Sequence, residues 1–160
     1  MTSNLQPHES VDRLAKVFED LLNTIPGGSA TIQRSRTPAN DGTLLWLKPS
    51  NPEAAEFSAH IEDNNSSLID VSFGSGTTLE LPIEANLPEE ASFGDMLQVV
   101  RELGAAVVAG RCHERFGWLG IKGTICVDAQ STYHSTRYFH LHLMPRTVHY
   151  RRYCNDLPVR

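Results

Sequence analysis

Two histidines, His140 and His142, are the residues of this sequence best placed to do chemistry. They alternate with apolar residues from Phe139 to Met144, a pattern that predicts a β-strand. Residues two apart in a strand share a face, so both imidazoles would project side by side. Paired imidazoles are common ligands of zinc, and a third ligand would have to come from elsewhere in the chain. The candidates for it are His113 or His134, followed by Cys112, Glu114 and His149.

The same pattern also has a structural explanation, and we favour it. One face of a strand in an antiparallel sheet often packs on the core while the other faces water, and polar side chains are common on the solvent-exposed face. His140 and His142 fit that position without any metal. We therefore expect no cofactor, and we keep zinc as the alternative.

A second group of residues combines arginine, histidine and aromatic side chains in the last third of the chain. Arginine interleaved with aromatic rings can clamp phosphates and stack on bases. The whole chain is acidic, however, with a net charge of −5, so we rank a nucleotide or nucleic acid below a protein as the partner. The candidate binding residues are Arg137, Tyr138, Arg146, His149, Arg151 and Arg152.

The charge is divided unevenly along the chain. Residues 1–100 contain 15 acidic and 5 basic side chains, whereas residues 101–160 contain 4 acidic and 9 basic ones. Such a division is typical of an anion-binding patch, but it also arises when two halves interleave in space and neutralise each other. We favour interleaving, because helices and strands from both halves of so short a chain must share one core.

Length and composition indicate one globular domain. A chain of 160 residues with 40% apolar and 21% charged side chains is long enough to bury a core without metal or disulfide crosslinks. Its three cysteines are Cys112, Cys126 and Cys154, an odd number without a Cys-x-x-Cys motif, which favours a reducing compartment. No secretory signal and no membrane-spanning segment are expected, so we predict a cytoplasmic location.

Two amphipathic helices and about eight strands are expected from the apolar periodicity. The first helix follows Ser10, a predicted N-cap, and ends at Pro26. The second lies between Ser92 and Gly110, with Gly104 predicted at a close contact between helix and sheet. The expected strands cover residues 29–36, 43–48, 57–62, 67–73, 77–83, 111–116, 119–127 and 136–144.

These elements predict an α+β fold, a curved and mainly antiparallel meander of about 6–8 strands packed against two helices. The single domain would span residues 1–160, with residues 1–9 and 154–160 as peripheral tails. The absence of a catalytic motif leads us to expect a non-catalytic binding or interaction protein, an immunity-like or chaperone-like partner of another protein. The alternatives are an enzyme or metal protein that uses His140 and His142, and a nucleotide- or nucleic-acid-binding protein that uses the basic aromatic end.

Overall fold

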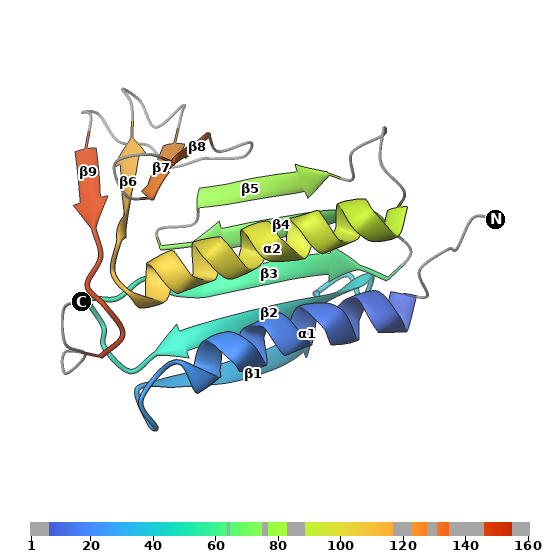
Figure 1. Cartoon of the computed structure of the whole chain (residues 1–160), viewed down its shortest axis with the longest axis horizontal. Helices are drawn as coiled ribbons and strands as arrows, with labels where there is room; N and C mark the ends of the chain where they lie inside the picture. The colour runs from blue at the N-terminus through green and yellow to red at the C-terminus, as the bar shows by residue number, and fades with distance from the viewer. Residues whose placement is uncertain are drawn as a thin grey trace.

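A helix, five strands, a second helix and four short strands follow one another along the chain (Figure 1). The computed structural model describes residues 7–63, 65–74, 77–82, 89–116, 123–127, 131–134 and 146–154. The helices are α1 (Pro7–Asn23) and α2 (Glu89–Val108). The strands between them are β1 (Ala30–Arg36), β2 (Gly42–Pro49), β3 (Phe57–Glu62), β4 (Asn65–Phe73) and β5 (Thr77–Pro82). The strands after α2 are β6 (Cys112–Phe116), β7 (Gly123–Val127), β8 (Ser131–His134) and β9 (Arg146–His149).

The first sheet is an antiparallel meander with the strand order β1-β2-β3-β4-β5, as predicted. Tight connections produce this order, because two strands joined by a short turn pair with each other. Asn40 supplies the left-handed residue of the first turn, with a φ of 58°. Side chains alternate across the sheet, so that Leu45, Leu47 and Phe57 lie on one face and are buried.

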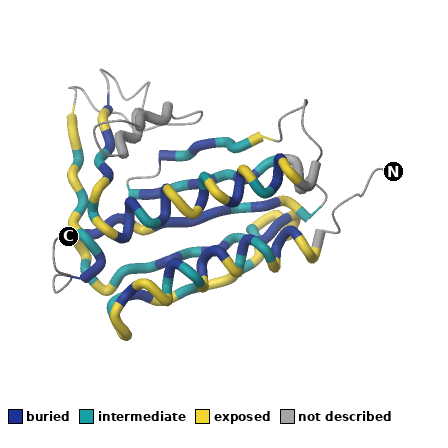
Figure 2. Tube along the Cα trace, in the orientation of Figure 1, coloured by how far each residue is buried: buried dark blue, intermediate teal, exposed yellow. Residues whose placement is uncertain are grey.

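Both helices cover the same face of this sheet (Figure 1). Each helix alternates buried and exposed positions along its length, the pattern of an amphipathic helix on a sheet (Figure 2). The α1 ring of Phe18 stacks on Phe57 of β3, with centroids 5.5 Å apart. The predicted apolar stripes are confirmed, although Ser10 lies inside α1 and not at its start. No described helix is long and apolar enough to cross a membrane.

Gly104 lies where the two helices and the sheet meet. A Cβ atom added there would lie 3.0 Å from Cε1 of Phe57 in β3 and would also collide with the side chain of Leu21 in α1. Both of these side chains are buried. The glycine therefore allows α2 to approach α1 and the sheet closely, which confirms the predicted close contact and outweighs its low helix propensity of about 1 kcal/mol relative to alanine.

The last third of the chain forms a second sheet with the strand order β8-β7-β6-β9. The α+β class is thus confirmed, but the expected single sheet of 6–8 strands is not, because the nine described strands fall into two sheets. The physical reason is the position of α2, which separates β5 from β6 and returns the chain at the other end of the first sheet (Figure 1). β8 lies between the strands expected at 119–127 and 136–144, where no strand was predicted, and the strand expected at 136–144 lies outside the described residues.

The C-terminal segment after β9 returns to the first sheet. Tyr153 is buried, and its hydroxyl donates its one proton mainly to the carbonyl oxygen of Ala55 at 2.7 Å, with the carbonyl oxygen of Leu47 at 3.2 Å as a second, weaker acceptor. Its backbone N–H donates to the carbonyl of Val108 at the end of α2. Burial is the main reason why the pKa of Tyr153 is raised, so the phenol stays protonated and remains a donor. This segment therefore holds α2, β2 and the second sheet together.

Glu114 forms the second connection between the sheets. It lies in the middle of β6 with a fully buried side chain, and it accepts hydrogen bonds from the hydroxyls of Thr77 and Tyr150. Gly74, in the turn before β5, has a φ of +59°, and a Cβ atom there would lie 2.7 Å from Oε2 of Glu114 and would also collide with the hydroxyl of Tyr150. The turn, the carboxylate and the phenol are thus in direct contact. A buried carboxylate is tolerated when donors satisfy its oxygens, and these hydroxyls do so.

We expect Glu114→Ala to destabilise the protein by about 3 kcal/mol, because the buried hydroxyl of Thr77 and the half-buried hydroxyl of Tyr150 lose this acceptor. Tyr150→Phe removes one donor and should cost about 1–3 kcal/mol. Urea unfolding followed by tryptophan fluorescence measures both losses. The matched control is Glu19→Ala on the exposed side of α1, which should change the free energy of unfolding by less than about 0.5 kcal/mol. Equal losses for Glu114→Ala and Glu19→Ala would contradict this role of Glu114.

Candidate functional site

Four of the residues predicted from the sequence to bind a ligand lie outside the described residues. They are His140, His142, Arg137 and Tyr138. The zinc site centred on the two histidines therefore stays a prediction. Within the described ranges, no group of three or more histidine, cysteine, aspartate or glutamate side chains could hold a metal ion.

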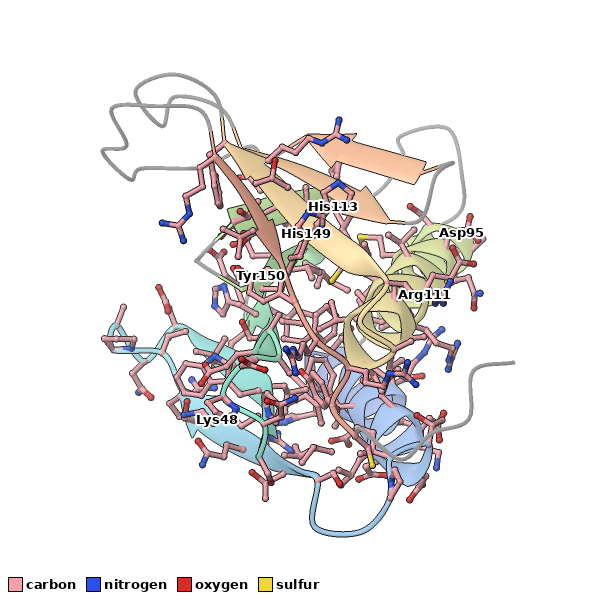
Figure 3. All side chains as sticks on the ribbon, turned by 90° about the vertical axis from the view of Figure 1, so that its left-hand side faces the viewer. Lys48, Asp95, Arg111, His113, His149 and Tyr150 are labelled. Atoms are coloured by element: carbon pink, nitrogen blue, oxygen red, sulfur yellow. The ribbon has the colours of Figure 1, made fainter. Side chains whose placement is uncertain are left out.

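His113 and His149 are brought together by the second sheet. They are register partners on β6 and β9, and their rings stack with centroids 5.0 Å apart (Figure 3). Burial lowers the pKa of His113, and the neighbouring His149 and Arg115 lower it further. His113 therefore favours its neutral form more strongly than a free imidazole does, because burial and the positive charges near it disfavour protonation.

The other predicted third ligand, His134, occupies a different row of the sheet. It pairs with Thr124 of β7, which pairs with Arg115 of β6. The backbone position of His134 is thus opposite Arg115, two residues along β6 from His113. Register alone does not bring His113 and His134 into one row.

The basic residues near the C-terminus are spread over several surroundings. Arg146 and His149 are exposed on β9. Arg151 forms an ion pair with Glu53, at 2.8 Å, which offsets its charge. Arg152 is half-buried, and its backbone carbonyl accepts a hydrogen bond from Asn51. The four described members of the predicted binding group therefore differ in exposure and in their partners, and their common binding role stays a prediction.

The face of the first sheet opposite the helices is the broadest feature that the sequence did not single out. No described helix or strand packs across it (Figure 1). Figure 3 places Lys48 on this side of the sheet, away from both helices. Consecutive register partners form two rows on this open face. One row is Gln33, Trp46, Ser58, Ser72 and Thr78, and the other is Ser35, Leu44, His60, Asp70 and Glu80.

A shallow cavity of about 190 Å³ lies at one end of the open face. Trp46, Ser58 and Ser72 line it, together with Gly74 and Glu56. The hydroxyls of Ser72 and Thr78 are hydrogen-bonded at 2.7 Å beside it. Its volume is below the range of about 300–1,000 Å³ that is typical of pockets for small molecules. The open face can therefore offer a surface for contact more readily than a deep binding pocket.

His60 and Asp70 form the one described pair on the open face that resembles part of a catalytic site. Nδ1 of His60 lies 3.6 Å from Oδ2 of Asp70, the arrangement of a base beside its orienting carboxylate. Nε2 of His60 is buried without a hydrogen-bond partner, and a Cβ atom on Gly42 would lie 2.5 Å from it. The backbone of β2 thus occupies the position where a substrate would have to meet this nitrogen.

A cavity of about 460 Å³ lies on the helix-covered side of the sheet. Its lining comes from the first turns of α1, from the end of β1 and from β2. Arg36 holds Asp63 in a two-pronged ion pair, with Nη1 2.8 Å from Oδ1. The hydrogen bond from Arg36 lowers the pKa of Asp63, so the carboxylate stays charged at neutral pH. Alternation in residues 29–36 was too weak to reveal this site in the sequence.

We expect His113 to titrate below the usual imidazole pKa of 6.5. His149→Gln should raise the pKa of His113 only partway to that value, because burial, the larger cause, remains. Nitrogen-resolved NMR of the imidazole signals measures both values, and His8→Gln, distant in the fold, is the control. Because the folded pKa is lowered, the unfolded chain binds more protons as pH falls through 6.5. Protonation of His113 should therefore lower the free energy of unfolding as the pH falls. A pKa of His113 that is unchanged in His149→Gln would contradict the electrostatic coupling of the two histidines.

Comparisons with known proteins give no relative for this fold and these sites. No family model, no curated protein and no solved structure matches the chain.

Proposed function

We propose that this protein is a non-catalytic binding protein, and that its open sheet face docks a basic surface of a partner protein. The observation that carries the proposal is the difference between the two faces of the first sheet. Two helices bury one face, and the other remains without a described cover (Figure 1). A broad sheet face with shallow relief suits another protein better than a small substrate.

The side chains of the open face favour protein contact. Trp46 is half-buried in the middle of β2 and lies among short hydroxyl side chains on β3 and β4. Lys48 sits 5.2 Å from the centre of its ring, which helps to fix the orientation of the indole. Tryptophan is enriched among the residues that dominate interface energies, because its large rigid ring loses little entropy on binding.

Charge on the open face indicates the kind of partner. By strand alternation, Glu62, Asp70 and Glu80 project on this side, and Lys48 is the basic counterpart that shares it. A second copy of the chain would present the same carboxylates and be repelled. A partner with exposed lysine or arginine would be attracted, and the attraction would weaken with salt.

The inaccessible Nε2 of His60 supports binding over catalysis. A general base must reach the proton that it removes, within about 3 Å or through one water molecule. The contact with Gly42 blocks that approach. The metal-dependent alternative rests on His140 and His142, which lie outside the described residues. The nucleic-acid-binding alternative rests on the basic aromatic end, of which Arg137 and Tyr138 lie outside them.

We expect Trp46→Ala to weaken the partner's binding by about 30-fold, the ~2 kcal/mol typical of a central interface residue. Tagged wild-type protein first isolates the partner from a lysate, and titration calorimetry with the purified partner then measures affinity. Glu62→Lys should also weaken binding, and 0.5 M salt should weaken it in the wild type.

The matched control is Glu19→Lys, the same charge reversal on the exposed side of α1. It should bind as the wild type does. A purified partner that binds Trp46→Ala and Glu62→Lys with wild-type affinity would exclude the open face as the docking surface. A partner that proves to be an RNA would support the nucleic-acid alternative in its place.

A further inference from the structure

The cavity of about 460 Å³ between α1 and the end of β1 has the size of a small-molecule site. His8 and Val11 of α1, Arg34 and Arg36 of β1, and Thr43 of β2 contribute to its wall. Arg34 pairs in register with the buried Leu45, and Arg36 with Thr43, so both arginines lie on the helix side of the sheet. The cavity is therefore on the side opposite the open face, and it is independent of the docking function proposed above.

Hydrogen bonds within the protein hold Arg36, which forms part of the cavity wall, in one position. The guanidinium of Arg36 donates to both carboxylate oxygens of Asp63, and also to the side chain and backbone oxygens of Asn40 at 3.1 and 2.8 Å. These four bonds use most of the five N–H donors of Arg36, and Asp63 balances its charge. Arg36 is thus a rigid part of the wall, and a ligand need not order it.

Arg34 differs from Arg36 in this respect. Its side chain makes no hydrogen bond and no ion pair with the residues that the structure describes, and it is exposed at the cavity. Its positive charge is not offset by Asp63, which is already paired with Arg36. The cavity wall therefore has one arginine whose planar donor fork is available to an oxyanion.

Thr43 gives a second, independent indication of a polar ligand. The residue is only 3% exposed, yet it lines the cavity, and its hydroxyl has no hydrogen-bond partner in the described part of the chain. The hydroxyl of a nearly buried residue that lines a cavity, and that has no protein partner, can hydrogen-bond to a ligand or a water molecule. Val11 is buried beside it and provides an apolar surface.

We propose that this cavity binds a small molecule with an oxyanion group, a carboxylate or a phosphate. The guanidinium of Arg34 would donate two parallel hydrogen bonds to the oxyanion. The hydroxyl of Thr43 would donate a third, and His8 would face the ligand from α1. The apolar side chain of Val11 would contact the ligand's carbon skeleton.

Titrations monitored by amide and arginine side-chain NMR signals test this site. The probes are inorganic phosphate and citrate, each at constant ionic strength against sodium chloride. We expect saturable shifts confined to residues 8–11, 34–36 and 43. The probe that binds more tightly identifies the phosphate or the carboxylate class.

Arg34→Gln should weaken binding at least ~10-fold, the effect of losing a charged hydrogen bond. Thr43→Val, which keeps the shape and removes the hydroxyl, should weaken it several-fold. The matched control is Arg115→Gln, an exposed arginine on β6 whose loss changes the charge equally and should leave binding intact. Spectra of the ligand-free variants verify the fold.

Two outcomes would overturn the proposal. In the first, the probes shift the NMR signals of β6 and β9, and Arg115→Gln weakens binding as much as Arg34→Gln does. That result would indicate a general attraction of anions to the basic last third of the chain. The second is no saturable shift with either probe at millimolar concentration. Neither outcome bears on the open face, which is tested with a protein partner and with different variants.

Discussion

Burial of one face of the five-stranded sheet beneath two helices is the constraint on which the rest of this structure depends. Strand alternation places Leu47, Phe57 and Val71 on that face, and each is fully buried. Removing these side chains from water is favourable through the hydrophobic effect, and α1 and α2 both have apolar stripes that can cover them. Because both described helices lie on one side, no described helix covers the other. The other face of the sheet is open because both amphipathic helices pack on the same side.

Buried polar contacts then determine where the second sheet lies. Glu114 and Tyr153 connect it to the first sheet from opposite directions, one from β6 and the other from the segment after β9. Such contacts are specific, because a carboxylate or phenol in a low-dielectric interior must have its partners in place. Apolar contact alone would allow many placements of a four-stranded sheet. The hydrogen bonds select one of them.

The two sides of the first sheet consequently differ in what they can bind. The open side is broad and shallow, with hydroxyl side chains beside Trp46 and carboxylates in the neighbouring row, which is the basis of the protein-docking proposal. The helix side contains a cavity whose wall includes the unpaired Arg34 and the preorganised Arg36, which suits a small anion. The acidic and basic halves of the chain interleave to some extent, as the ion pair of Arg151 with Glu53 illustrates. The histidine pair on β6 and β9 is a third feature, separate from both sides.

The sequence by itself determined the elements that depend on local order. The stripe from Val11 to Ile25, the meander from β1 to β5, and the close approach at Gly104 could all be predicted, because periodicity and turn residues act between near neighbours. Only the tertiary structure decided the division into two sheets, the burial of Glu114, the pairing of His113 with His149 and the cavity around Arg34. These features join residues that are far apart in the chain, such as Thr77 and Glu114 at a separation of 37. A contact of that kind leaves no periodic trace in the sequence, since it depends on how completed elements pack against each other.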